Sequence, residues 1–247
     1  MAEIRGIDVS KHQGTIDWNK VKASGIEFAF IRIGWTWYDG GITMDEMFIK
    51  NYNGAKAAGL KVGVYVYSYD RTVVAASKAA DALINILKDY KIDYPIVFDI
   101  EDAYNKTLTK KVNTDIVSTF LDKIEKAGYY AMIYTFVSFA NSNLDMSALS
   151  RFDTWIAHWG VSKPNYSRAY SVWQYSNSGT INGINSSVDL NYAYKDLAAR
   201  IKEKGLNHLD NDTVTKEEYD RLVEENKKLK DKIEDAKDTL ADVINNL

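Results

Sequence analysis

Eight short runs of apolar, β-branched and aromatic residues recur along the first 205 residues, and this repetition constrains the fold more than any other feature. Stretches with the four-residue apolar spacing of an amphipathic helix separate the earlier runs. Strands that alternate with helices form parallel sheets, so eight of them predict an irregular (β/α)8-type barrel of the α/β class. The last three runs leave little room for helices, and the irregularity is expected there. The expected strands are residues 4–9, 28–33, 62–67, 96–100, 129–134, 155–159, 172–175 and 188–192, and the expected helices are about 45–58, 75–90 and 110–127.

Composition changes sharply after residue 205. Residues 206–247 hold 12 acidic and 7 basic side chains and only one of the chain's 31 aromatic rings. Such a polar segment cannot bury a core of its own and must be helical, disordered or paired. We expect a barrel domain over residues 1–205 and a helical tail over residues 206–247.

A heptad pattern in the tail predicts a coiled coil. Counted from Tyr219, eight of the nine a and d positions are apolar, which favours a homo-oligomer formed through residues 215–247. A lone solvated helix, or one that lies on the barrel, is the alternative. The nine positions are Tyr219, Asn226, Ile233, Leu240 and Leu247 at a, and Leu222, Leu229, Ala236 and Val243 at d.

Charge and composition exclude several classes of partner. A net charge of −3 gives no general attraction to nucleic acid or anionic lipid, and no apolar stretch approaches the length of a membrane span. The absence of cysteine excludes disulfides and thiolate chemistry. The first residues lack the apolar segment of a secretory signal, so we expect the protein to stay in the cytoplasm until another agent releases it, with action outside the cell still possible.

Carboxylates occupy the ends of three expected strands. Asp8 ends the first, Asp99 and Glu101 end the fourth, and Asp189 lies in the last. Reactive groups of such barrels lie at the carboxyl ends of the strands, and strand alternation puts Asp99 and Glu101 on one face. Close carboxyls push their pKa values apart, and glycoside hydrolysis needs both a proton donor and a carboxylate. Loop capping or pairing with Lys and Arg is the structural alternative.

Several motifs resemble those of the family 25 glycoside hydrolases, the Chalaropsis-type lysozymes of bacteria and bacteriophages. The similarity covers about residues 4–195. The motifs are GIDVSKHQG at 6–14, IDW at 16–18, FIR at 30–32, GVYVY at 63–67, FDIE at 98–101, WQY at 173–175 and VDLN at 188–191.

The resemblance implies an N-acetylmuramidase that cleaves the β-1,4 bond from N-acetylmuramic acid to N-acetylglucosamine in peptidoglycan glycan strands, without a cofactor. It further implies a phage or prophage endolysin. In this family pattern Glu101 is the general acid and Asp99 the second catalytic carboxylate, while Asp8 and Asp189 form an acidic floor. The expected substrate-binding rings are Tyr65, Tyr67, Tyr134 and Trp173.

Two other functions fit parts of the pattern. Clustered carboxylates also bind Mg²⁺ or Mn²⁺, but the three histidines lack the spacing of metal ligands, so no metal is expected. A non-catalytic carbohydrate-binding barrel would keep the aromatic rings and could lose the acid, whereas this chain retains Glu101.

Overall fold

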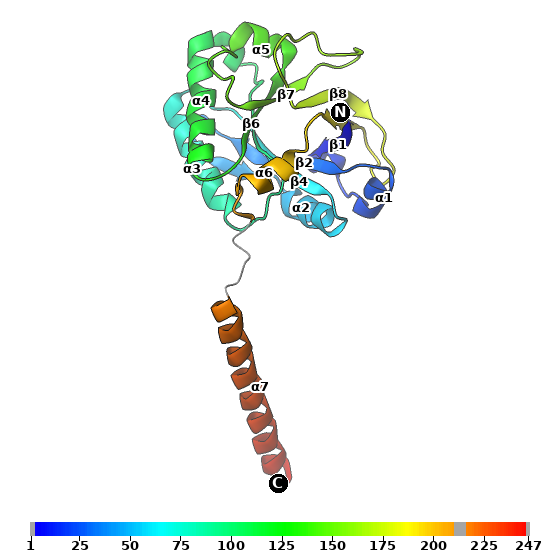
Figure 1. The fold of residues 1–247 in the computed structure, drawn as a ribbon, viewed down its shortest axis with the longest axis vertical. Helices are drawn as coiled ribbons and strands as arrows, with labels where there is room; N and C mark the ends of the chain where they lie inside the picture. The colour runs from blue at the N-terminus through cyan, green and yellow to red at the C-terminus, as the bar shows by residue number, and fades with distance from the viewer. Residues whose placement is uncertain (1–2, 210–215, 246–247) are drawn as a thin grey trace. The chain divides into compact units, whose positions relative to one another are not determined.

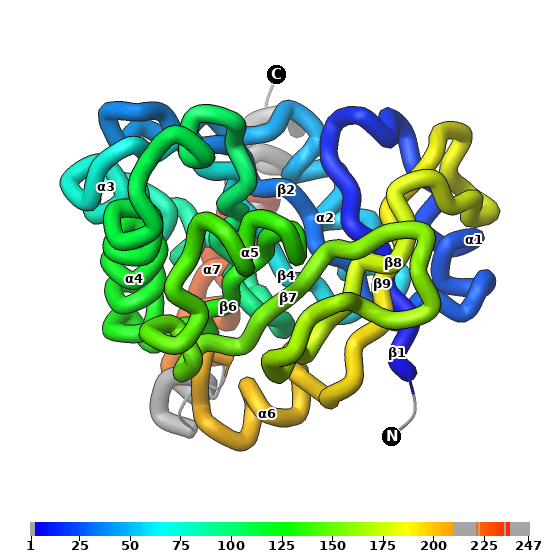
Figure 2. The backbone as a smooth tube through the Cα atoms, turned by 90° about the horizontal axis from the view of Figure 1, so that it is seen from above, coloured from blue at the N-terminus to red at the C-terminus, as the bar shows by residue number. Residues whose placement is uncertain are grey.

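Eight strands close into a barrel (Figures 1 and 2). The computed structural model describes residues 3–209 and 216–245. The ring order is β1-β9-β8-β7-β6-β5-β4-β2, and β1 completes it by pairing with both β9 and β2. The expected eight-stranded α/β barrel is therefore confirmed. The ring strands are β1 (Ile4–Val9), β2 (Phe28–Thr36), β4 (Lys61–Tyr67), β5 (Ile96–Asp99), β6 (Ala131–Phe136), β7 (Asp153–Ala157), β8 (Val172–Gly179) and β9 (Val188–Ala193).

The irregularity lies in β9, which runs antiparallel to both of its neighbours. The other pairings between ring strands are parallel. In a reversed strand the first residues lie where the parallel strands end. Asp189, the second residue of β9, consequently pairs in register with Asp8 near the end of β1.

Inward-facing side chains fill the barrel with aromatic rings. Phe28 and Phe30 of β2 pack with Tyr94 and Trp155, and the rings of Phe30 and Trp155 stack at 4.4 Å between centroids. Gly6 on β1 faces the ring of Phe28 so closely that a Cβ atom would overlap it. These rings fill the middle of the barrel.

Helices cover the outside of the parallel strands (Figure 2). Their apolar faces pack on outward-facing strand residues, and Phe120 of α4 stacks on Phe98 of β5 at 4.3 Å. No helix lies between β8 and β9. There the outward rings of Trp173, Tyr175 and Tyr192 pack together, with Tyr175 and Tyr192 stacked at 4.4 Å. The helices are α1 (Trp18–Ala23), α2 (Phe48–Ala57), α3 (Val73–Leu87), α4 (Lys110–Lys126), α5 (Val137–Asn143) and α6 (Leu197–Glu203).

Several boundaries differ from those expected. Asp45 does not begin α2, because its carboxylate accepts a hydrogen bond from the backbone of Met47 and binds Arg32 instead. The strand expected from residue 129, β6, starts at Ala131, since the backbone N–H of Tyr129 still donates to the carbonyl of Ile124 at the end of α4. The short strand β3 (Ile42–Met44), which forms a hairpin with β2, was not predicted.

The barrel unit extends past residue 205 to Leu209. Asn207 is buried and its side chain accepts a hydrogen bond from the backbone of Tyr130 and donates to the carbonyls of Ile92 and Tyr94. Residues 206–209 therefore close, together with α6, the end of the barrel at which the parallel strands begin.

The second unit contains α7 (Lys216–Asn245), a continuous helix as expected. Of the predicted seam, Asn226, Leu229, Ile233 and Ala236 are exposed within this unit. The coiled coil stays a prediction, since the side chains of its other positions, Tyr219, Leu222, Leu240, Val243 and Leu247, lie outside the described residues.

Candidate active site

A cavity of about 360 Å³ opens at the carboxyl ends of the parallel strands. It brings together all four carboxylates selected from the sequence, although they come from β1, β9 and the end of β5. Three of the four selected rings also line it. The predicted residues that line the cavity are Asp8, Asp99, Glu101, Asp189, Tyr65, Tyr67 and Tyr134.

Asp99 and Glu101 share one side of the chain at the end of β5, as the alternation predicted. Ile100 between them is buried in the core, and its backbone N–H donates to Tyr134 and continues the sheet for one residue. Oδ1 of Asp99 and Oε2 of Glu101 are buried and have no hydrogen-bond partner among the described residues. Burying a polar oxygen without a hydrogen-bond partner is costly, which indicates a functional reason for its position. Because these two oxygens have no partner, they are available to bind a ligand.

Burial is the main influence on these two carboxyls. It raises the pKa of Glu101 to about 7, and the charge of Asp189 adds to the increase. Burial is also the largest cause of the raised pKa of Asp99, and repulsion from Glu101 raises it further, while the Arg32 guanidinium opposes the increase. The cavity thus holds carboxyl protons near neutral pH, which an exposed pair would have lost.

Two side-chain amides hold Asp8 in place. Its Oδ2 accepts hydrogen bonds from Gln174 Nε2 at 2.9 Å and from Asn191 Nδ2 at 2.8 Å. Trp155 donates to the amide oxygen of Asn191, and Tyr134 donates to that of Gln174. Because the amide oxygens already accept from these donors, both NH₂ groups are directed at Asp8.

Asp8 and Asp189 form a coupled pair on the cavity floor. Burial raises the pKa of both carboxyls, and the nearby charge of Asp189 raises that of Asp8 further. The hydrogen bonds that Asp8 accepts from Asn191 and Gln174 oppose this increase, because they favour the ionised carboxylate.

Arg32 is the cation that faces this acidic cavity from β2. Its Nε and one terminal nitrogen both bind Oδ2 of the buried Asp45, at 2.8 and 2.7 Å. The backbone N–H of Lys11 donates to the same oxygen. Asp45 therefore fixes the guanidinium and offsets part of its charge, so Arg32 does not neutralise the cluster.

Trp173 does not line the cavity. Side chains alternate between the two faces of β8, and Gln174 faces the inside of the barrel. Trp173 therefore faces outward, where it packs in the hydrophobic core outside the barrel and donates a hydrogen bond to the carbonyl of His158. The motif indicated this part of the strand correctly but not the face. Sequence analysis also did not select Gln174, Asn191, Trp155 or Arg32 for the site, although two-residue spacing from Asp189 indicates Asn191.

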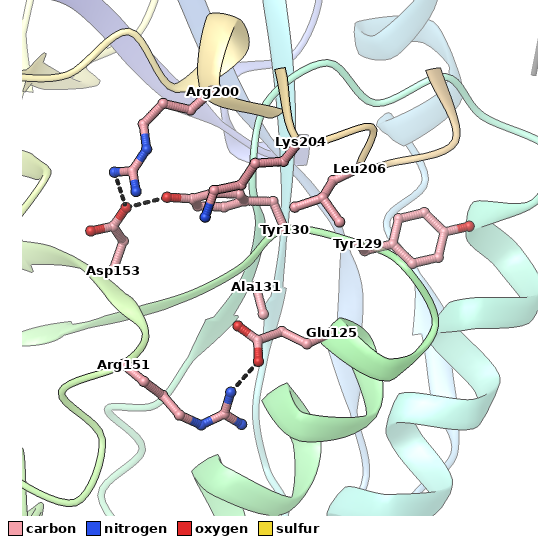
Figure 3. Close-up of a pocket in the computed structure, with 9 residues that line it drawn as sticks. All are labelled: Glu125, Tyr129, Tyr130, Ala131, Arg151, Asp153, Arg200, Lys204 and Leu206. Carbon is pink, nitrogen blue, oxygen red and sulfur yellow. Dashed lines mark hydrogen bonds and ion pairs between the residues drawn. The ribbon is translucent and has the colours of Figure 1, made fainter. Parts of the chain in front are cut away.

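A second cavity, of about 200 Å³, lies at the opposite end of the barrel (Figure 3). There Arg200 and Lys195 bind Asp153, and Arg151 binds Glu125. Although burial opposes it, hydrogen bonds from Lys195 and Tyr130 leave the pKa of Asp153 below its ordinary value. These paired carboxylates have the properties of structural ion pairs, in contrast to those of the first cavity.

Among the described residues, no group of three or more histidine, aspartate or glutamate side chains has the arrangement of a metal site. In the same part of the chain, no helix has both the length and the apolar character required to cross a membrane.

Comparisons with known proteins point to one family. The sequence model of Glycosyl hydrolases family 25 matches residues 7–184, which include the cavity residues up to Asn177 but not Asp189. An autolytic lysozyme of Clostridium acetobutylicum is 34% identical over 76% of this chain, and the match covers 55% of that protein, so this chain spans about half of its length. Lysozyme M1 of Streptomyces globisporus is 31% identical over 80% of this chain and 70% of its own. A family 25 glycosyl hydrolase of Bacillus anthracis has a similar structure, with a TM-score of 0.69, 27% identity, and coverage of 81% of this chain and 93% of its own.

Proposed function

The chain belongs to Glycosyl hydrolases family 25, and from this premise we propose that it is an N-acetylmuramidase that hydrolyses the glycan strands of bacterial peptidoglycan. The observation that carries the proposal is the pair Asp99 and Glu101, which lie two residues apart in one cavity and each have a buried carboxyl oxygen without a hydrogen-bond partner among the described residues. A structural pair would have cationic partners, as Asp153 and Glu125 do at the other end of the barrel.

In the proposed reaction Glu101 donates its proton to the oxygen of the departing N-acetylglucosamine as the glycosidic bond breaks. Its pKa of about 7 keeps it protonated in weakly acidic solution. Asp99 acts in its ionised form, which burial disfavours and the Arg32 guanidinium favours. It stabilises the positive charge at the anomeric carbon, either by direct attack or by assisting the acetamido group of the substrate. Water then completes hydrolysis, with Glu101 as the base that accepts its proton.

The product identifies the bond. Purified cell walls treated with the protein should lose turbidity and yield fragments with muramic acid at the reducing end, which borohydride converts to muramitol. Reducing N-acetylglucosamine, or free amino groups without reducing sugar, would contradict the proposal.

Replacing Asp189 by asparagine is expected to shift the alkaline limb of kcat to lower pH. The charge of Asp189 raises the pKa of Glu101, so its removal lets the acid lose its proton earlier as the pH rises. Burial, the larger cause, remains, and the limb should stay above the range of an exposed carboxyl. The measurement is kcat against pH for wild type, Asp189→Asn and the surface control Asp115→Asn. An alkaline limb that does not move in Asp189→Asn would show that Asp189 does not influence the acid.

The tail is proposed to join copies of the chain as a coiled coil, which would raise avidity for an extended wall surface. Leu229 and Ile233 support this, being 53% and 55% exposed on α7. Light scattering at micromolar concentration should give a mass of at least two chains for wild type and of one chain for Leu229→Asn/Ile233→Asn. Lys227→Gln, at the outward b position, is the control. A monomeric wild type would contradict the oligomer, and equal wall lysis by the two forms would contradict the gain in avidity.

A further inference from the structure

Four exposed aromatic side chains lie beyond the rim of the acidic cavity. Trp37 and Tyr38 are in the turn between β2 and β3, Tyr69 follows β4, and Tyr104 follows β5. Their exposed fractions are 42%, 62%, 36% and 42%. All three segments follow the carboxyl ends of adjacent parallel strands, so they share the end of the barrel that carries the proposed active site.

Ring contacts connect these side chains to the cavity. Tyr67, which lines the cavity, lies 4.9 Å from the ring of Tyr69, and Tyr69 stacks on Trp37 at 6.0 Å. On the other side, Asp102 accepts hydrogen bonds from the hydroxyl of Tyr67 and the backbone of Tyr104. A ligand that leaves the cavity past Tyr67 would therefore meet these exposed rings.

The positively charged guanidinium of Arg71 lies among these rings. Its guanidinium lies 3.9 Å from the centroid of Tyr104 and 5.5 Å from that of Tyr38. It forms no ion pair with any carboxylate in the described part of the chain, whereas Arg32, Arg151 and Arg200 each do. Two aromatic faces orient the guanidinium but leave its N–H groups without an anionic partner.

The backbone beside Arg71 is anchored from below. Asp70 is fully buried, and Ser68 donates to its carboxyl at 3.2 Å. Asn105 Nδ2 donates to the carbonyl of Asp70 at 3.0 Å and ties this loop to the segment that carries Tyr104. Arg71 is thus an exposed side chain on a fixed base, which lowers the entropic cost of binding a ligand.

We propose that Arg71 binds a carboxylate of the stem peptide carried by muramyl residues of the substrate. The inference rests on the proposed function and adds to it a preference for glycan strands that bear acidic peptides. The cavity itself is acidic and disfavours anions, so a carboxylate of the substrate is accommodated outside it. A guanidinium binds carboxylate through two parallel N–H···O bonds, and Tyr38 and Tyr104 would contact the apolar parts of the peptide.

The test compares two substrates that differ only in charge: soluble peptide-bearing glycan strands, and the same strands with stem carboxylates converted to primary amides. For Arg71→Gln, KM on the carboxylate strands should rise about five-fold, the effect of one well-oriented exposed ion pair, with kcat retained. On the amidated strands wild type and Arg71→Gln should have the same KM. Arg71→Lys should keep part of the preference, and Tyr104→Phe, which keeps the ring, should keep more of it than Tyr104→Ala.

Lys61→Gln is the control for net charge. Lys61 is exposed at the start of β4, whereas Arg71 lies beyond the end of that strand, so the two cations are at opposite ends of it. An equal change in KM on both substrates, or none on either, would overturn the role of Arg71. Those outcomes are distinct from failure of the proposed function, in which wild type would release no reducing ends from either substrate.

Discussion

Glu101→Gln should reduce wall hydrolysis by about 10²–10⁴-fold, the contribution of general acid catalysis, while the protein stays folded. Glutamine keeps the shape of the side chain and can still donate a hydrogen bond from its amide, but it cannot transfer a proton to the leaving oxygen. The measurement is the initial rate of turbidity loss, with reducing ends counted in parallel.

The matched control is Glu125→Gln, which changes the same residue type in the cavity at the opposite end of the barrel (Figure 3). It breaks the ion pair with Arg151 and should leave the rate close to that of wild type. Lysis by Glu101→Gln at the wild-type rate would end the assignment of the acid.

Asp99→Asn is expected to reduce turnover by about 10²–10³-fold, because it removes the anion that faces the developing positive charge. Asp8→Asn should reduce turnover less, since both NH₂ groups of Gln174 and Asn191 occupy Oδ2 of Asp8, whereas an oxygen of Asp99 is left without a partner among the described residues. If Asp8→Asn lost as much activity as Asp99→Asn with substrate binding unchanged, the two roles would have been assigned the wrong way round.

Thermal unfolding distinguishes loss of chemistry from loss of fold in Asp99→Asn. Burial raises the pKa of Asp99 in the folded protein above its unfolded value. The resulting stabilisation is present at low pH and is lost as the pH rises through the folded pKa. Asparagine carries no charge to bury, so the melting temperature of Asp99→Asn relative to that of wild type should increase as the pH rises. A relative melting temperature that falls as the pH rises would indicate that the carboxylate stabilises the fold.

The core of the barrel and its acidic centre could be predicted because they rest on local patterns. Strand alternation placed Asp99 and Glu101 together, and each expected strand overlaps a strand of the ring. The face of Trp173 could not be predicted, because the large rings of Trp173 and Tyr175 lie on the outward face of β8 and the polar Gln174 between them lines the cavity, and the strand alone does not indicate which of its faces is inward. The hairpin strand β3 is three residues long, too short for a periodic signal. Trp155 lies in an apolar run and is indistinguishable in sequence from an ordinary core residue. Its hydrogen bond to Asn191 joins two strands far apart in sequence and could not be predicted from either.

Ring closure by β1 and β9 has a consequence for the order in which the site is assembled. Asp8 is synthesised early, but the two amides that bind it come 166 residues later, in β8, and 183 residues later, in β9. Its register partner Asp189 also belongs to β9. A nascent chain that has produced Asp99 and Glu101 still lacks these contacts, and β1 lacks its second neighbour until β9 emerges. Such distant pairing makes folding slow and cooperative. Hydrolytic competence would accordingly be acquired in one late step, when the final strand is delivered.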